Sequence, residues 1–306
     1  MLAVLDPWRF QPHFEVWLLI AAVAGGYWYA VARIGPTAVA PGEAVVTRRQ
    51  MGWFAAGVVT LWAASDWPLH DVSEQHLYSA HMLQHMMLSY FMPPMLLLGT
   101  PAWLLRLIVG DGRLYSVVRF LAKPVVAGVL FNVAVMVTHI PAVVNASVDG
   151  PPVTHYALHT MVVLLSLLMW MCVCGPLPEL RLRTAPAMIY LFAQSIVPTV
   201  PAGWLTFAEG AVYKAYDRPD RLWGVSVTDD QQLAGVIMKV GGSVFLWTLV
   251  GFLFFCRFAK NWNTDNGYRR IDRMPDAEIV GTAEGELTYD DVAREFEHTP
   301  AAREPR

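Results

Sequence analysis

The chain has 306 residues, of which 55% are hydrophobic and only 15% are charged. This composition indicates a membrane protein, and the formal net charge of −3 gives no support for nucleic-acid binding. The sequence holds three cysteines, and their positions do not indicate a disulfide framework.

Long apolar segments predict an all-α polytopic membrane protein with about seven transmembrane helices, because one crossing of the hydrocarbon core needs about 20 residues. In chain order, the predicted segments are 14–34, 51–67, 76–98, 124–144, 154–175, 186–206 and 232–256. The second segment is short, and we expect its helix to begin within the preceding basic turn. The first follows Asp6, contains Glu15 and lacks a clear cleavage site, so we interpret it as a retained helix rather than a signal peptide.

The end of the chain is polar. We therefore predict a transmembrane domain over 1–258 and a cytoplasmic tail over 259–306. The tail turns acidic after Pro275, and this composition predicts a largely disordered segment. A capping pattern from Thr288 indicates one short helix at 289–297.

Basic residues occupy alternate connections between the predicted helices. They are Arg48, Arg49, Arg106, Arg113, Arg119, Lys123, Arg181, Arg183, Arg257, Lys260, Arg269, Arg270 and Arg273. In contrast, the connections 68–76 and 145–153 hold no lysine or arginine, and 207–231 holds three against five acids. By the positive-inside rule, the N-terminus lies outside the membrane and the C-terminus lies in the cytoplasm.

Eight of the nine histidines then fall on the external side of the membrane. They are His13, His70, His76, His81, His85, His139, His155 and His159. The three cysteines, Cys172, Cys174 and Cys256, fall at the opposite ends of their helices, so thiolates cannot easily share a site with these histidines. Because ionisable groups inside a membrane are costly, the one-sided histidines are candidates for a functional site.

Two pairs of histidines lie one helical turn apart, His81 with His85 and His155 with His159. This spacing places both rings of a pair on one helix face, where they can bind one metal ion. The predicted principal ligands are these four, and the candidates that complete or relay the site are His139, His70, Met238 and Asp66. Imidazole with thioether favours copper in either oxidation state, whereas a carboxylate ligand would favour zinc, iron or manganese.

Prolines fall within two of the predicted helices. Pro93 and Pro94 interrupt the third segment, and Pro198 and Pro201 interrupt the sixth. Each proline removes a backbone donor, so we expect these helices to kink or break.

Four stretches of the chain carry a resemblance to a known family. They are HMLQHMMLSYFMPPMLLLGTP at 81–101, HYALHTMVVLLSLLMW at 155–170, GPLPE at 175–179 and DQQLAGVIMKVGG at 230–242. Together they resemble the CtaG-type cytochrome c oxidase assembly factors, which are seven-span bacterial membrane proteins. One departure is Lys239, where the family pattern has an apolar aromatic residue, and we expect this side chain to extend towards the interface.

The resemblance implies a multi-pass protein of the bacterial plasma membrane that assembles a haem–copper oxidase through copper delivery or maturation of its metal centre. It implies oxidase subunits and a copper donor protein as partners. The paired histidines match the family's histidine positions, and Gln231 and Met238 match its last motif. We expect ligand exchange rather than turnover of a substrate, because no acid–base pair lies beside a nucleophile.

Three other functions are consistent with the residues. A haem-binding redox protein would use one histidine from each pair as an axial ligand, although the sequence holds no C-x-x-C-H motif. A metal-dependent hydrolase or hydroxylase would need Asp66 or Glu209 as its general base. A purely structural partner of the oxidase would bind no metal.

Overall fold

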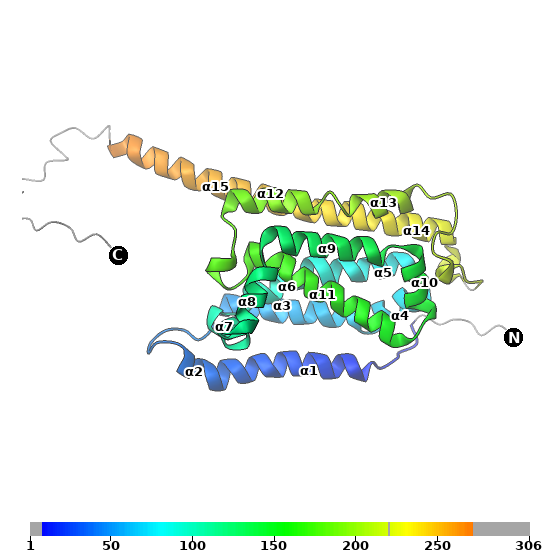
Figure 1. The fold of residues 1–306 in the computed structure, drawn as a ribbon, viewed down its shortest axis with the longest axis horizontal. Helices are drawn as coiled ribbons and strands as arrows, with labels where there is room; N and C mark the ends of the chain where they lie inside the picture. The colour runs from blue at the N-terminus through cyan, green and yellow to red at the C-terminus, as the bar shows by residue number, and fades with distance from the viewer. Residues whose placement is uncertain (1–7, 220, 272–306) are drawn as a thin grey trace, which may run out of the picture. The chain divides into compact units, whose positions relative to one another are not determined.

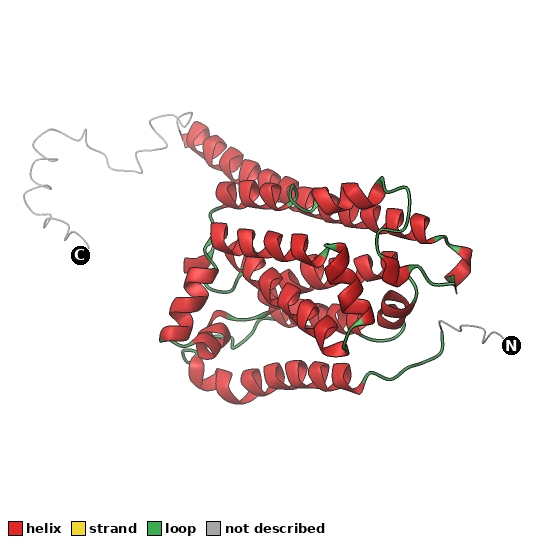
Figure 2. Cartoon of the chain, turned by 45° about the vertical axis from the view of Figure 1, so that its right-hand side comes forward, coloured by secondary structure: helices red, strands yellow, loops and turns green. Residues whose placement is uncertain are grey.

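The structure is a computed structural model that describes residues 8–219 and 221–271. Every regular element in this part of the chain is a helix, as Figure 2 shows, so the predicted all-α fold class is confirmed. The chain divides at Phe255 into two units, and all the helices that hold the paired histidines belong to the first.

The elements of the first half are α1 (Phe14–Tyr29), the π-helix η1 (Ala30–Ile34), α2 (Gly35–Ala38), α3 (Arg48–Ser65), α4 (Leu69–Gln75), α5 (Tyr78–Met86), the π-helix η2 (Met87–Phe91), α6 (Met92–Gly99), α7 (Ala102–Val109), α8 (Arg113–Leu121), α9 (Pro124–Thr138) and α10 (Pro141–Asp149). Those of the second half are α11 (Pro152–Cys174), η3 (Pro178–Leu180), α12 (Thr184–Gln194), α13 (Thr199–Thr206), η4 (Lys214–Tyr216), η5 (Leu222–Gly224), α14 (Val227–Val236), the π-helix η6 (Ile237–Gly241) and α15 (Gly242–Ile271).

Several helices are long and apolar enough to cross a membrane. Four qualify alone, namely Phe14–Ala38, Pro152–Cys174, Thr184–Thr206 and Val227–Lys260. Two more qualify as bent pairs, Tyr78–Gly99 with Ala102–Val109 at 101° and Arg113–Leu121 with Pro124–Thr138 at 72°. The described residues thus contain four to six candidate spans rather than the seven predicted. The difference lies in α3, which has 18 residues and opens with Arg48 and Arg49, as expected for a helix that begins in the basic turn.

The prolines change the helices in the predicted places. Pro93 cannot donate to the carbonyl of Ser89, and this carbonyl instead accepts a hydrogen bond of 2.9 Å from the indole Nε1 of Trp170. The π-helix η2 precedes the prolines, so the third segment continues through α6 without a break. In the sixth segment, α12 ends at Gln194 and α13 begins at Thr199, directly after Pro198.

Three predicted boundaries differ from the structure. The connection 68–76 contains the helix α4, whose seven residues carry His70. The fourth helix ends at Thr138 rather than near 144, because Pro141 starts the separate helix α10. The last helix continues to Ile271, beyond the predicted start of the tail, and the helix predicted at 289–297 lies outside the described residues.

Within the first unit, α6 contacts α3 and α11, and α5 contacts α14 (Figure 1). Small residues bring α3 and α6 close together: an added Cβ at Gly99 would lie 2.4 Å from the backbone nitrogen of Phe54, and one at Gly57 would lie 2.7 Å from Leu96 Cδ2. The large, fully buried side chains Phe131 and Trp170 belong to the main core.

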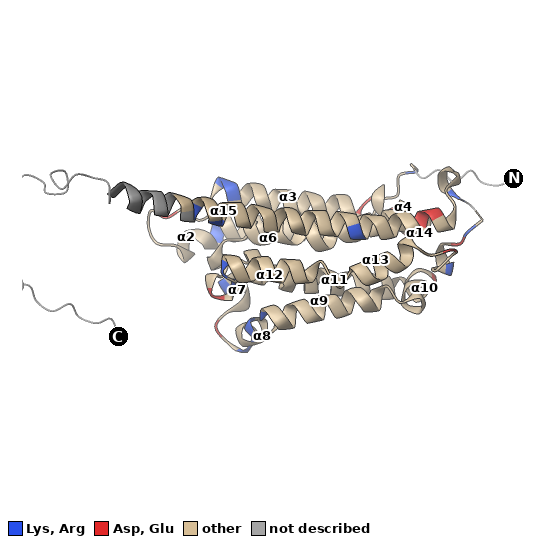
Figure 3. Ribbon diagram, turned by 90° about the horizontal axis from the view of Figure 1, so that it is seen from above, with Lys and Arg blue, Asp and Glu red and all other residues tan. Residues whose placement is uncertain are grey.

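The two ends of this unit differ in charge and in histidine content. Figure 3 shows lysine and arginine gathered around α2, α7 and α8. The opposite end holds the first residues of α1, α5 and α11, the end of α9, and α4 (Figure 1). Five of the eight histidines lie within α4, α5 and α11, and His13, His76 and His139 directly flank α1, α4 and α9.

Candidate metal centre

Three of the four paired histidines converge in the structure. Ligand atoms of His81, His85 and His159 all lie within 4.8 Å of one another. The Nε2 atoms of His81 and His85 are 3.0 Å apart, and the ring of His159 is 5.3 Å and 4.6 Å from the rings of His81 and His85. We call these three residues the histidine triad.

The spacing of the triad fits one metal ion. Two nitrogens that each lie about 2.0 Å from a three- or four-coordinate ion are about 3.3 to 3.5 Å apart, close to the separation of His81 and His85. Two buried ring nitrogens, Nδ1 of His81 and Nε2 of His159, have no hydrogen-bond partner in the described residues. A buried nitrogen without a partner is destabilising, and coordination would satisfy Nε2 of His159.

The first turn of α5, which carries His81, is held in place by α14. The fully buried carboxylate of Asp230 accepts hydrogen bonds from the backbone nitrogens of Tyr78 and Ser79, at 2.8 Å and 3.0 Å, and from the Ser79 hydroxyl at 2.5 Å. Asp230 thus supplies the cap that α5 lacks locally, and its charge is favourable at a helix N-terminus. The DQQ motif that begins at Asp230 does not by itself indicate this role.

The next residue of that motif, Gln231, anchors the chain between α13 and α14. Its Oε1 accepts from the backbone nitrogens of Val212 and Tyr213 at 2.8 Å and 3.2 Å, and its Nε2 donates to the Tyr213 carbonyl at 3.1 Å. The Tyr213 hydroxyl in turn donates to the His139 carbonyl at 2.9 Å. Gln231 is therefore a positioning residue in this structure.

The fourth paired histidine, His155, faces outward from the triad. Its ring stacks on His159 with centroids 4.3 Å apart and planes at 27°. Its Nε2 lies 2.7 Å from Oε1 of Glu74, and its Nδ1 lies 3.2 Å from the Ser147 hydroxyl. Of the four predicted principal ligands, three therefore form the triad, and the fourth, His155, lies between the triad and Glu74.

His70 also lies next to Glu74, and its hydrogen bonds define its tautomer. The Gln84 Nε2 donates to the Ala64 carbonyl at 2.8 Å and also contacts His70 Nδ1 at 3.1 Å. Because a carbonyl can only accept, this amide nitrogen faces both groups, and Nδ1 of His70 is an acceptor. Its hydrogen is then on Nε2, which lies 3.2 Å from Glu74 Oε1. His70 thus orients Glu74 in this structure.

Glu74 on α4 is a candidate functional residue that the sequence alone did not indicate. Burial alone would raise the pKa of its carboxyl, but the contact with His155 and the charges of His70, His155 and His13 outweigh burial and lower that pKa. Burial lowers the pKa of His70, which favours its neutral form. The available signal was the i, i+4 spacing of His70 and Glu74, which matters only if 69–75 is recognised as a helix.

Three other predicted ligands lie in different surroundings. His139 is buried, with Nδ1 2.6 Å from the Val135 carbonyl and no hydrogen-bond partner described for Nε2. Asp66 accepts from the indoles of Trp17 and Trp62 at 2.8 Å and 2.6 Å, so its carboxylate joins α1 to α3 and is not grouped with the triad.

Met238 is buried within η6 and lines a small pocket with Tyr90 and Thr199. Its neighbour Lys239 donates from Nζ to the Thr199 hydroxyl at 2.6 Å. The family departure at Lys239 therefore gives the π-helix a polar contact with α13. Met238 therefore lies at this pocket, which no residue of the triad lines.

These features define a helical membrane protein with a histidine cluster inside one end of its bundle. The family described as cytochrome c oxidase caa3 assembly factor (Caa3_CtaG) matches residues 25–260, and the chain belongs to this family. The predicted resemblance is thereby confirmed. No curated protein and no solved structure matches the chain.

Proposed function

We propose that this assembly factor binds Cu(I) at the histidine triad and delivers it to a cytochrome c oxidase during assembly. The observation that carries the proposal is the convergence of His81, His85 and His159, with Nε2 of His159 buried and without a hydrogen-bond partner among the described residues. Copper is the cargo here. Ligand exchange with a donor protein would load it, and exchange with an oxidase subunit would release it.

The donor set favours monovalent copper over divalent ions. Three neutral imidazoles add no charge, so a bound Cu(I) leaves a single positive charge in a buried site. The idealised cost of burying an ion grows with the square of its charge, so a divalent ion would cost about four times as much. Imidazole is a suitable ligand for copper, and three such ligands leave a coordination position open for exchange.

The proposal includes a topology that suits delivery at the external face. Seven spans, with α3 as the short second one, would place the N-terminus outside and the arginine-rich end in the cytoplasm. The triad would then lie just below the external surface of the bacterial plasma membrane. Copper would arrive there from an external donor and leave to an oxidase subunit in the same membrane.

The test is the copper content of purified protein measured together with oxidase activity in the same strains. We expect one Cu(I) per chain in the wild type, and loss of both copper and oxidase activity in His81→Ala/His85→Ala. The matched control is His298→Ala, which removes a histidine from the polar tail and should change neither quantity.

Two results would contradict the proposal. Equal copper content in the wild type and the double variant, with lost oxidase activity, would indicate a partner that binds no copper at the triad. A haem Soret band in the reduced-minus-oxidised spectrum of the purified protein would indicate a redox protein instead.

A further inference from the structure

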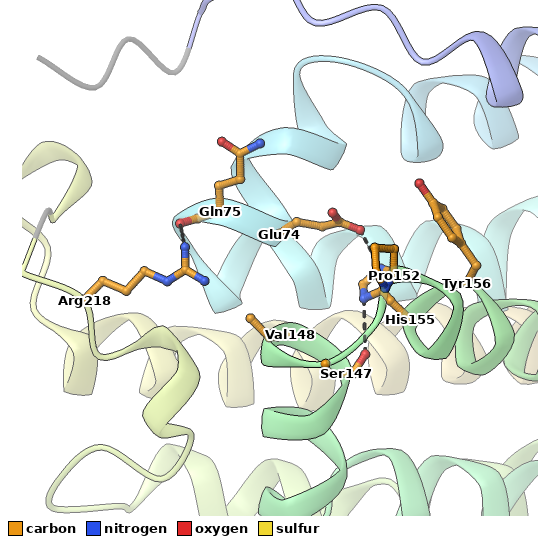
Figure 4. A pocket seen from close by; sticks show the side chains of 9 residues that line it. Glu74, Gln75, Ser147, Val148, Pro152, His155, Tyr156 and Arg218 are labelled. Carbon is orange, nitrogen blue, oxygen red and sulfur yellow. Dashed lines mark hydrogen bonds and ion pairs between the residues drawn. The ribbon is translucent and has the colours of Figure 1, made fainter. Parts of the chain in front are cut away.

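A pocket of about 220 Å³ opens beside the triad, on the side of α4 and α10. Figure 4 shows the side chains of Glu74 and His155 meeting at this pocket, with Ser147 below the histidine ring. Glu74 comes from α4, Ser147 from α10 and His155 from α11. Residues of three helices therefore line this pocket at the histidine-rich end of the unit.

We propose that Glu74 and His155 form an outer loading site, which captures copper from this pocket and passes it to the triad. The inference rests on the proposed function, because it supplies the route by which the ion reaches His159. It adds a ligand, Glu74, that belongs to neither the predicted nor the proposed set.

The position of His155 makes it a bridge between the pocket and the triad. Its Nε2 contacts Glu74 at 2.7 Å on one side, and its ring stacks on His159 at 4.3 Å on the other. A neutral His155 that gives Nε2 to an ion carries its hydrogen on Nδ1. The Ser147 hydroxyl, 3.2 Å from Nδ1, can accept that hydrogen bond.

Glu74 has the exposure and orientation that a capturing ligand needs. Its side chain is 34% exposed, whereas those of His70 and His155 are 7% and 8% exposed. Nε2 of His70 lies 3.2 Å from Glu74 Oε1, the same oxygen that lies 2.7 Å from Nε2 of His155. The guanidinium of Arg218, which also lines the pocket, is turned to the backbone carbonyls of Ala215 and Gln75 at 3.2 Å and 3.5 Å.

The change in donor atoms gives the transfer a direction. The outer site offers one carboxylate oxygen and one imidazole, and the triad offers three imidazoles. Cu(I) prefers the softer nitrogen set, so it is bound more tightly by the triad than by Glu74. The ion moves inward by exchange of ligands, with no change in its oxidation state, and Glu74 returns to its contact with His155.

The test is the rate at which the detergent-solubilised full chain takes Cu(I) from its coloured bicinchoninate complex. We expect Glu74→Gln to load about tenfold more slowly than the wild type, because the variant lacks the carboxylate that accepts the ion as bicinchoninate leaves, and loss of a group that supports a metal site costs about 10- to 100-fold. The final copper content should be unchanged. Glu74→Asp, which keeps the charge on a shorter side chain, should give an intermediate rate.

Glu15→Gln is the matched control, because Glu15 is a carboxylate near the same end with its side chain 58% exposed and no contact described with His155. It should load at the wild-type rate. Equal rates for Glu74→Gln and the wild type, with normal final copper content, would overturn the loading site and leave the proposed function intact.

A variant without the triad, His81→Ala/His85→Ala/His159→Ala, separates the two proposals. If its weak residual binding of Cu(I) is abolished by adding Glu74→Gln, the outer site is supported even where wild-type binding at the triad fails. If Glu74→Gln leaves that residual binding unchanged, the outer site is wrong. Size-exclusion chromatography of each variant establishes that the chain is folded.

Discussion

The triad and the outer loading site of Glu74 and His155 lie side by side, but they differ in how their polar atoms are satisfied. Glu74 is contacted by His70 and His155, and His70 is in turn contacted by Gln84. In the triad, two buried nitrogens have no hydrogen-bond partner among the described residues, whereas Nε2 of His155, which also lacks a hydrogen bond, lies 2.7 Å from the Glu74 carboxylate. A satisfied group is stable without an ion, whereas an unsatisfied one gains from binding an ion. We therefore assign stable binding of copper to the triad and transfer of copper to the outer loading site.

The largest expected effect is on the affinity of the triad. His159→Ala leaves two imidazoles, and we expect the affinity for Cu(I) to fall at least about 100-fold, which corresponds to about 2.7 kcal/mol. Competition with bicinchoninate measures this affinity. An unchanged affinity would exclude His159 from the copper ligands. The triad could then no longer be distinguished from the outer loading site as the place where copper is bound stably.

The next effect tests whether α14 positions the triad. Asp230→Ala removes three hydrogen bonds from the first turn of α5, and we expect a loss of about 3 kcal/mol in the free energy of unfolding. Thermal unfolding in detergent measures it. Asp229→Asn is the control, because Asp229 hydrogen-bonds to Ser226 within its own helix turn, and we expect this substitution to cost less than about 1 kcal/mol. Equal losses in both variants would contradict the positioning role.

A substitution at Gln84, which contacts His70, should affect the outer loading site more than the triad. Gln84→Leu leaves the Ala64 carbonyl and Nδ1 of His70 without their donor, and we expect a cost of about 1 to 3 kcal/mol in unfolding free energy. The loading rate should fall because His70 no longer holds Glu74, while the final affinity stays within about threefold of the wild type. A fall in affinity with an unchanged loading rate would reverse the assignment.

The smallest effect concerns Ser147. Ser147→Ala removes one neutral hydrogen bond to His155, so we expect loading to slow by only about twofold to fivefold. Ser147→Thr keeps the hydroxyl and should restore the rate. Stopped-flow measurement of loading resolves this difference, and a rate identical to the wild type would show that Ser147 does not support the bridging tautomer.

Periodicity and spacing predicted much of this arrangement. The one-turn spacing of His81 and His85 placed both rings on one face of α5, and the apolar runs located every long helix. Proline chemistry predicted the break before α13. These features are local, so a single segment of sequence is sufficient to predict them.

The parts that the sequence did not predict depend on contacts between distant segments. The cap that Asp230 gives to α5 joins residues about 150 positions apart, and no local pattern indicates it. The role of Glu74 depends on α4, a seven-residue helix too short for a clear periodic signal. The outward orientation of His155 depends on how α11 packs near α4, although its spacing is identical to that of the α5 pair.

The most direct test of the central claim is X-ray absorption at the copper edge of the Cu(I)-loaded wild-type protein. We expect three nitrogen scatterers at about 2.0 Å and no sulfur in the first shell, because the triad supplies only imidazole. A sulfur scatterer would place a methionine such as Met238 in the site. A first shell of two nitrogens, or a spectrum unchanged in His159→Ala, would contradict the triad as the binding site.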